Sequence, residues 1–347
     1  MFIPSLSRGT LSTVIRTLRL YKRNRSLKPL GSIWTHAYRK AAGKPSTFHI
    51  TIALTHRCML NCVHCYAGGR RTEGEKELST EEVKSVLDQA RSMGVLQLMF
   101  SGGEPLLRED LPELIRYARN LGFLTVVNTN GWLLDRERVA VLKEAGLTQC
   151  RVSIDAPNPE ICDRLRGEEG VYERAVQGIR YMREAGVTCQ ILTYASKSNL
   201  EGGLDELIAL GRRLGVFAIF IFFPVAVGNW DGRRDLILSW EEKKRVWRLQ
   251  GLTFVHLELP SPEYECCVIT KEEIYISPTG NVAPCPFTPY YEGNIREHPL
   301  LKIWENHCQH FTVRHHGGCP LNDEISCKAI QEQVREASKA LSETKAS

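Results

Sequence analysis

Three cysteines in one short segment are the residues of this sequence best suited to bind a metal cofactor. Cys58, Cys62 and Cys65 have the spacing C-x3-C-x2-C and follow an apolar run, residues 48–55, that predicts a buried strand. Three thiolates on one loop can bind three irons of a 4Fe–4S cluster and leave its fourth iron open for a chelating ligand. Incidental loop cysteines and a zinc site with a distant fourth ligand are the alternatives.

Polar and glycine-rich segments follow the next three predicted strands. They are residues 101–105, 128–131 and 153–155. Glycines allow a ligand to approach the backbone closely, and a glutamate can accept hydrogen bonds from an ammonium group. Each segment could also be a loop whose polar groups are satisfied within the protein. Because the carboxyl ends of parallel strands meet at one edge, we expect these segments to line the same mouth as the cysteines.

With these motifs the sequence resembles the radical S-adenosylmethionine (SAM) superfamily, from residue 48 to about residue 330. The resemblance implies that Cys58, Cys62 and Cys65 bind a 4Fe–4S cluster whose open iron holds the amino and carboxylate groups of SAM. One electron through the cluster would cleave SAM to a 5′-deoxyadenosyl radical, which abstracts hydrogen from a substrate. We expect a ferredoxin or flavodoxin to supply that electron.

The same resemblance implies which residues contact SAM. Segment 101–105 would hold the methionine amino group, His64 would pack near the adenine, and Ser153 would contact the nucleoside or the methionine carboxylate. Arg166 is similar to a carboxylate-binding arginine of the family. The predicted cofactor-binding residues are His64, Gly102, Gly103, Glu104, Pro105, Asn130, Ser153 and Arg166.

The order of predicted elements indicates an α/β fold. From residue 48 to about residue 250, strand-length apolar runs alternate with amphipathic helices. Six such units predict a parallel sheet with right-handed crossovers, in the form of a partial (β/α)6 TIM barrel. The predicted strands are 48–55, 96–100, 124–128, 150–154, 188–192 and 218–223, and the predicted helices are 79–93, 110–121, 136–145, 172–185, 204–214 and 240–249.

Residues 251–333 predict a small cysteine-rich module with a β-hairpin at 273–285. This module resembles the SPASM and Twitch extensions of radical SAM enzymes. The C-x2-C-x5-C-x3-C run of a full SPASM module is missing, so the resemblance implies a Twitch-like module with one auxiliary 4Fe–4S cluster. Zinc is the alternative, because histidines lie nearby. The predicted ligands are Cys267 (or its neighbour Cys266), Cys285, Cys319 and Cys327, with Cys308 assigned to the core.

The two ends of the sequence differ in charge from the rest. Residues 1–47 contain ten Lys or Arg and no Asp or Glu, although the net charge of the whole protein is only +5. Helical spacing of apolar residues from Leu11 to Tyr21, followed by Trp34 and Tyr38, predicts a basic amphipathic arm. Such an arm could contact a membrane surface or a partner, or pack on the barrel. Residues 334–347 predict a polar helical tail.

Composition narrows the class of protein further. No apolar run is long enough to cross a bilayer, and the N-terminal segment is not a signal peptide, because Arg16, Arg19 and Lys22 interrupt it. We therefore expect a cytoplasmic enzyme, in which the twelve cysteines bind metal or pack in the core rather than form disulfides. The core cysteines would be Cys150, Cys162 and Cys189. No nucleic-acid partner is indicated.

The favoured function is oxidative modification of a C–H position in an apolar or membrane-associated small molecule. Examples are a tetrapyrrole, such as a haem precursor or a bacteriochlorophyll-type ring, on which relatives with similar C-terminal modules act, and an isoprenoid lipid. The basic amphipathic arm suits a carboxylated, hydrophobic substrate that arrives from a membrane surface. Maturation of a ribosomally synthesised peptide is the alternative, although residues 1–47 lack the pattern of a leader-binding domain. An iron–sulfur scaffold without enzymatic activity is the least favoured, because the SAM motifs are intact.

Overall fold

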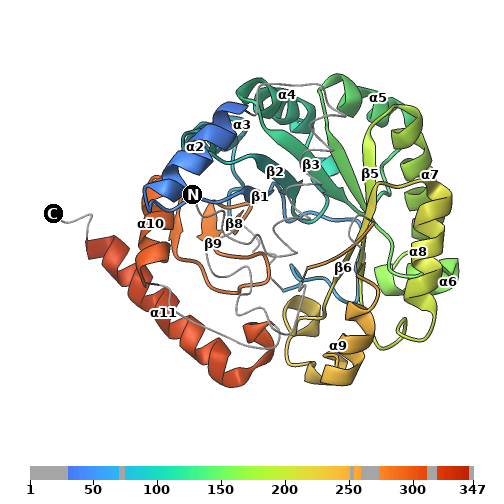
Figure 1. Ribbon diagram of the computed structural model, residues 1–347. Helices are drawn as coiled ribbons and strands as arrows, with labels where there is room; N and C mark the ends of the chain where they lie inside the picture. The colour runs from blue at the N-terminus through green and yellow to red at the C-terminus, as the bar shows by residue number, and fades with distance from the viewer. Residues whose placement is uncertain (1–29, 70–74, 251–253, 259–272, 311–318, 344–347) are drawn as a thin grey trace, which may run out of the picture.

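The computed structural model describes residues 30–69, 75–250, 254–258, 273–310 and 319–343 of the 347-residue protein. Within these residues one curved sheet of ten strands forms the centre, in the order β10-β9-β8-β1-β2-β3-β4-β5-β6-β7. Helices α3, α4, α5, α7 and α8 lie on its outer side (Figure 1). The strands are β1 (His49–Ala53), β2 (Gln97–Ser101), β3 (Leu124–Thr129), β4 (Gln149–Ser153), β5 (Thr188–Tyr194), β6 (Ala218–Phe222), β7 (Val255–Leu257), β8 (Glu273–Ile276), β9 (Asn281–Ala283) and β10 (Gly293–Asn294).

Strand pairing confirms the α/β prediction and extends it at both edges of the barrel. β1 to β7 pair in sequence order and in parallel, as the predicted strand–helix units require. β7 lies beyond the sixth predicted strand, and β8 pairs in parallel with β1 on the other side. The parallel part of the sheet, β8 and β1 to β7, therefore has eight strands instead of the expected six.

The predicted hairpin is present, and its first strand joins the barrel. β8 and β9 pair antiparallel, with Tyr275 opposite Ala283. The Thr51 hydroxyl donates a 2.6 Å hydrogen bond to Glu273 across the β1–β8 pair. The cysteine-rich module predicted to begin at residue 251 thus shares one sheet with the barrel.

Helices connect the parallel strands, and the first of these helices, α3, begins with a capping box. The Ser79 side chain accepts from the Glu82 amide, and the Glu82 carboxylate accepts from the Ser79 amide. The eight-residue helix α6 is absent from the prediction, because it is too short to show a helical period. The helices are α2 (Leu30–Ala41), α3 (Thr80–Ser92), α4 (Leu111–Leu121), α5 (Arg136–Glu144), α6 (Pro159–Arg166), α7 (Val171–Glu184), α8 (Gly203–Leu214), α9 (Trp240–Trp247), α10 (Leu300–His310) and α11 (Glu324–Glu343).

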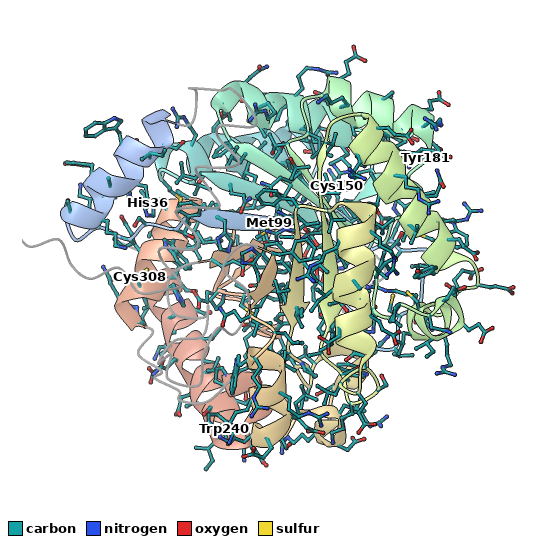
Figure 2. The ribbon with its side chains drawn as sticks, turned by 45° about the vertical axis from the view of Figure 1, so that its right-hand side comes forward. His36, Met99, Cys150, Tyr181, Trp240 and Cys308 are labelled. Atoms are coloured by element: carbon teal, nitrogen blue, oxygen red, sulfur yellow. The ribbon has the colours of Figure 1, made fainter. Side chains whose placement is uncertain are left out.

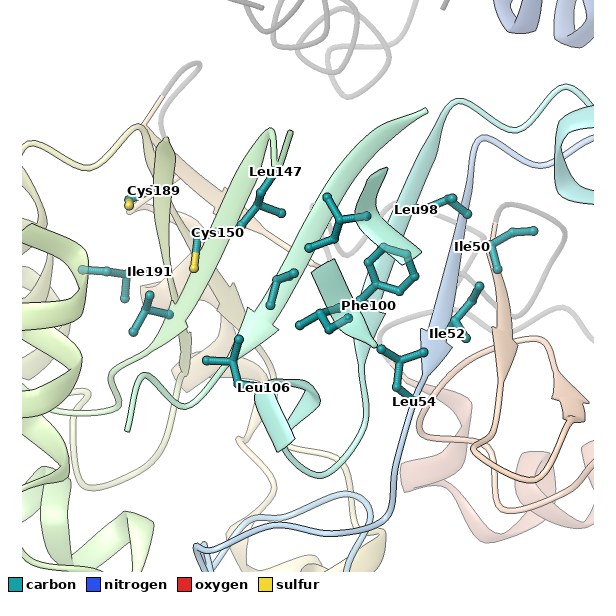
Figure 3. Close-up of a cluster of buried hydrophobic side chains, with 14 of the residues drawn as sticks. Ile50, Ile52, Leu54, Leu98, Phe100, Leu106, Leu147, Cys150, Cys189 and Ile191 are labelled. Atoms are coloured by element: carbon teal, nitrogen blue, oxygen red, sulfur yellow. The ribbon is translucent and has the colours of Figure 1, made fainter. Parts of the chain in front are cut away.

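The main core lies between the sheet and the outer helices. Ile50 and Phe100 are fully buried on this side, and Figure 3 shows them in one layer with the side chains of neighbouring strands. Cys150 and Cys189 lie in the same layer, and Cys162 belongs to the same core, which confirms the prediction for these three cysteines.

The inner side of the sheet is more polar than the outer side. Met99 lies near the centre of the molecule (Figure 2), and its sulfur is 3.3 Å from an Arg151 nitrogen. Arg151 Nε also donates to the Gln190 side-chain oxygen at 2.8 Å, and its guanidinium lies 4.2 Å from the Phe220 ring centroid. Because side chains alternate along a strand, this polar interior accompanies the apolar outer layer.

The predicted polar helical tail belongs to a longer helix with one buried face. Helix α11 continues to Glu343 and packs beside α10. Its buried residues are Ile330, Val334, Ala337 and Leu341, whose spacing of three and four residues forms one apolar face. That face stabilises the helix, although most of its surface is polar.

Only residues 30–47 of the predicted arm are described. Helix α2 lies against α3, where Arg91 donates a hydrogen bond to the buried Ser32 hydroxyl. Arg39 is 3.7 Å from Glu305 of α10, while Trp34 and Tyr38 are exposed. The amphipathic segment predicted around Leu11 lies outside the described residues. None of the described helices has the length and apolar character needed to cross a membrane.

Candidate active site

Cys58, Cys62 and Cys65 lie together on the loop after β1, which we call the radical-cluster loop (residues 58–65). All three thiols are partly buried and form no disulfide. Nitrogen atoms approach two of the sulfurs. Arg166 Nη1 is 3.8 Å from Cys62 Sγ, and Asn130 Nδ2 is 3.8 Å from Cys58 Sγ. Donors around sulfur suit thiolate ligands.

Burial opposes ionisation of one of these thiols. It raises the pKa of Cys62 to about 11, against the opposing effect of the Arg166 guanidinium. A bound metal deprotonates a coordinating thiol, so iron would overcome this penalty. The loop is thus suited to hold a cluster rather than a free reactive thiolate.

The predicted glycine-rich segment 101–105 packs directly on the strand end that precedes this loop. Gly103 donates to the Thr55 carbonyl at 2.7 Å, and Glu104 donates to the Arg57 carbonyl at 2.8 Å. Gly102 has φ of 132°, and a Cβ there would lie 2.5 Å from the Thr55 carbonyl oxygen. Only glycine fits this contact, so the segment is held against the start of the radical-cluster loop.

The Glu104 side chain is fully buried and binds protein groups on both oxygens. Oε1 accepts from the Leu106 amide and the Thr129 hydroxyl, and Oε2 accepts from the Asn130 amide. Burial raises the pKa of Glu104 to about 7, and the hydrogen bonds from Asn130, Leu106 and Thr129 counteract that rise. The observed contacts make Glu104 a tie between β2 and β3; its predicted contact with the SAM ammonium group stays a prediction.

Asn130 is the residue that this tie positions. Its backbone is fixed by Glu104, and its Nδ2 lies 3.3 Å from Met59 Sδ as well as close to Cys58. The sequence places Asn130 at the end of the third strand, and the structure brings it to the radical-cluster loop. Pro105 begins the short 3-10 helix Pro105–Leu107 and is buried.

His64, Asp155 and Arg166 form a buried charged group beside the same loop. The distance from Asp155 Oδ2 is 2.6 Å to Arg166 Nε and 3.1 Å to His64 Nε2. Burial alone would raise the pKa of Asp155, but Arg166 and His64 together lower it well below its usual range. Asp155 therefore links α6 to the radical-cluster loop as a carboxylate.

These contacts refine two predicted roles. His64 is buried, and its ring centroid lies 4.9 Å from that of Tyr194 and 5.7 Å from that of Trp230. Arg166, predicted to bind a carboxylate of SAM, is ion-paired with Asp155. Direct contact of either residue with SAM stays a prediction.

Ser153 ends β4 at the same edge of the sheet. It pairs in register with Leu192 of β5, and it is partly exposed, whereas the preceding residue Val152 is fully buried. Ser153 therefore lies at the carboxyl end of its strand, and its predicted contact with SAM stays a prediction.

Three of the four predicted auxiliary ligands come together in a second cluster of buried residues. Cys285, Cys319 and Cys327 all pack in it, although they are far apart in sequence. The Phe287 amide donates to Cys285 Sγ at 3.3 Å, and the Tyr290 hydroxyl is 3.9 Å from Cys327 Sγ. The fourth ligand, Cys267, and its alternative Cys266 lie outside the described residues. Cys308 lies on α10 and packs against the main core.

Comparison with known proteins agrees with this geometry. The Radical SAM superfamily model matches residues 52–208, and the model of SPASM, an iron–sulfur cluster-binding domain, matches residues 266–328. The chain is 36% identical to the AdoMet-dependent heme synthase of Methanosarcina barkeri over 282 residues, which cover 73% of this chain and 80% of that protein. The chain belongs to the radical SAM superfamily.

Other radical SAM proteins are similar over a shorter segment or at lower sequence identity. The Fe-coproporphyrin III synthase of M. barkeri is 44% identical over 193 residues, which cover 56% of this chain and 48% of that protein. The PqqA peptide cyclase of Rhizobium meliloti is 31% identical over 72% of both chains. The crystal structure of Streptococcus suis SuiB bound to S-adenosylmethionine has a TM-score of 0.64 and 19% identity, covering 78% of this chain and 68% of that one. That likeness confirms the fold.

The radical SAM and SPASM matches establish an enzyme that uses SAM and two 4Fe–4S clusters. Among the described residues, no three Cys, His, Asp or Glu side chains are arranged as a ready-made metal site, but the thiols and their neighbours have the chemistry that both clusters need. The radical-cluster loop has three thiols, and nitrogen donors lie near two of their sulfurs. The buried group around Cys285, Cys319 and Cys327 has three more thiols, and one of them accepts a hydrogen bond from a backbone amide. When bound and reduced, the first cluster and SAM supply a 5′-deoxyadenosyl radical.

The sequence analysis did not identify the two aromatic residues, Tyr194 and Trp230, whose rings pack against His64. Tyr194 stands at the end of β5, and Trp230 lies in the loop after β6. Burial raises the pKa of Tyr194 well above its usual range, so its hydroxyl stays protonated. The sequence signal that could have identified Tyr194 and Trp230 is their position after predicted strands, because residues that follow successive parallel strands gather at the mouth of a barrel.

Proposed function

We propose that this radical SAM enzyme oxidises a C–H position of a tetrapyrrole haem precursor. The observation that carries the proposal is the 36% identity with the AdoMet-dependent heme synthase of M. barkeri, over 73% of this chain. The similarity to the Fe-coproporphyrin III synthase of the same organism points to the same class of compound.

In this proposal, one group of residues holds the cluster and SAM that form the radical, and a second group holds the electron acceptor. The radical-cluster loop would hold the first cluster, with Asn130 and Arg166 beside its sulfurs. Segment 101–105, supported by Glu104, would shape the SAM site. Net oxidation requires an electron acceptor once the substrate has lost a hydrogen atom. Cys285, Cys319 and Cys327, with Cys267, would hold that acceptor.

Contact between the two sites supports this division. Tyr66 directly follows the radical-cluster loop, and its ring lies 5.6 Å from the ring of Phe287, two residues after Cys285. Both rings belong to the buried cluster that contains the auxiliary cysteines. The acceptor would therefore lie beside the site at which the substrate radical forms.

Maturation of a ribosomally synthesised peptide is the second candidate. It is favoured by the similarity to the PqqA peptide cyclase of R. meliloti, which covers 72% of both chains. It ranks second because its sequence identity, 31%, is lower than that of the heme synthase.

The exposed face of α2 supports a peripheral membrane contact of an otherwise cytoplasmic enzyme. Trp34 is 76% exposed and Tyr38 is 65% exposed, one helical turn apart. Trp and Tyr are favoured at membrane interfaces, and basic residues are attracted to anionic lipid. Lys40 and Lys44, on and just after α2, supply such charge. A ferredoxin or flavodoxin is the proposed electron donor.

Anaerobic assay of the reconstituted enzyme tests the proposal. With SAM and a reductant, the enzyme should convert an iron–porphyrin haem precursor, with Fe-coproporphyrin III as the first compound, and release 5′-deoxyadenosine. Mass spectrometry of the porphyrin gives the mass change. If 5′-deoxyadenosine forms only with a precursor peptide, and the porphyrin is unchanged, the peptide hypothesis replaces this one.

A further inference from the structure

We propose that residues 224–230 form a strap that holds the radical-cluster loop and the auxiliary cysteine cluster in fixed positions relative to each other. The positioning residues are Asn229, within the strap, and Asn322, which lies outside the strap and binds it. The strap runs from the end of β6 through the 3-10 helix Gly228–Trp230. The inference rests on the two cluster sites and is independent of the substrate proposed above.

The carboxyl end of the strap binds the backbone of the radical-cluster loop. Asn229 Nδ2 donates to the Cys62 carbonyl at 2.8 Å, and the Asn229 amide donates to the Cys65 carbonyl at 2.9 Å. Gly228 makes this approach possible, because a Cβ there would lie 2.2 Å from the Cys65 carbonyl oxygen. One residue thus fixes the backbone of two cluster ligands.

The amino end of the strap is held by the auxiliary site. Asn322 Oδ1 accepts from the Ala226 amide at 2.9 Å, and Asn322 Nδ2 donates to the Pro224 carbonyl at 2.9 Å. The Asn322 amide in turn donates to the Cys319 carbonyl at 3.1 Å. The side chain of Asn322 therefore grips the strap with both its donor and its acceptor, close to one auxiliary ligand.

Apolar contacts join the middle of the strap to the same site. Val225 and Val227 are buried in one cluster with Cys285 and Cys319. Every segment of the strap is thus in contact with one of the two cysteine groups. A displacement of the auxiliary ligands would move the strap and, through Asn229, the backbone of Cys62 and Cys65.

The consequence is coupling between the two cluster sites, which is reciprocal where it acts on binding. Asn322→Ala removes both hydrogen bonds to the strap and leaves every cysteine in place. We expect it to weaken SAM binding roughly five- to ten-fold, which is at the low end of the coupling typical between two sites of one protein. We also expect a changed electron paramagnetic resonance (EPR) spectrum of the reduced first cluster.

The test uses anaerobically reconstituted full-length protein without substrate. EPR titration with SAM gives the dissociation constant, and iron analysis shows that both clusters are loaded. Asn306→Ala is the matched control, because Asn306 Nδ2 donates to the Ala337 carbonyl at 2.8 Å in the same part of the protein but does not touch the strap. This control should bind SAM as wild type does.

Two results would overturn the strap. The first is an Asn322→Ala protein that keeps both clusters and matches wild type in SAM affinity and in the EPR spectrum of the first cluster. The second result applies if Asn322→Ala loses auxiliary iron, because the Asn229→Ala variant then tests the coupling between the two cluster sites. This variant, changed at the opposite end, should alter the EPR signal of the auxiliary cluster, and an unaltered signal would refute the coupling. Both measurements are independent of whether the substrate is a porphyrin.

Discussion

Replacement of Glu104 by Gln should remove a pH dependence of stability that the buried carboxyl imposes. The pKa of Glu104 is raised from 4.5 to about 7, chiefly by burial. A group with a raised pKa in the folded state contributes its full stability below the unfolded pKa, and this contribution is lost as the pH rises through the folded pKa. A shift of about 2.5 units corresponds to about 3 kcal/mol in total, of which about 2.5 kcal/mol falls between pH 5 and pH 8.

Urea unfolding of the iron-free protein, followed by circular dichroism under reducing conditions, measures this effect. The variant should be less stable than wild type at pH 5, because the Gln amide meets the Asn130 amide donor at one end. The difference between the two proteins should shrink by about 2.5 kcal/mol at pH 8, since only wild type carries the buried charge there. A difference that stays constant from pH 5 to pH 8 would refute the assignment of the raised pKa to Glu104.

Three further predictions concern metal, mechanism and surface. Reconstituted wild type should hold about eight irons, and the variant with Cys58, Cys62 and Cys65 replaced by Ala should hold about four; a triple variant with full iron would contradict the ligand assignment. Cys285→Ala should still release 5′-deoxyadenosine but yield no oxidised product, whereas product at the wild-type rate would make the auxiliary site structural. Trp34→Ala should reduce co-sedimentation with anionic vesicles at low salt, and Trp240→Ala, at a 45% exposed tryptophan of α9, should not; equal binding by all three proteins would remove α2 from the membrane contact.

The barrel could be predicted because its signals are local. Each strand of the six units is an apolar run, and each following helix shows amphipathic spacing or a cap such as Ser79 with Glu82. The two extra parallel strands could not be predicted in this way. β7 has only three residues, and the partner of β8 is decided by tertiary packing more than 200 residues away from β1 in sequence.

In the candidate site too, features with a local sequence signal could be predicted, and contacts between distant residues could not. Cysteine spacing placed the radical-cluster loop, and position after a strand placed Asn130 and Ser153. The partners of Asp155 are not local, since His64 and Arg166 reach it from opposite sides in sequence. The structure also shows protein contacts of Glu104 that the sequence did not predict, because sequence motifs carry no information on which protein groups a buried carboxylate binds.

Transfer of deuterium from substrate to 5′-deoxyadenosine is the most direct test of the central claim. The enzyme would be incubated anaerobically with SAM, a reductant and Fe-coproporphyrin III that is deuterated at all of its carbon-bound hydrogen positions, and the nucleoside analysed by mass spectrometry. The proposed function predicts 5′-deoxyadenosine that carries one deuterium, together with an oxidised porphyrin. Unlabelled 5′-deoxyadenosine with unchanged porphyrin would contradict the claim that this enzyme oxidises a haem precursor.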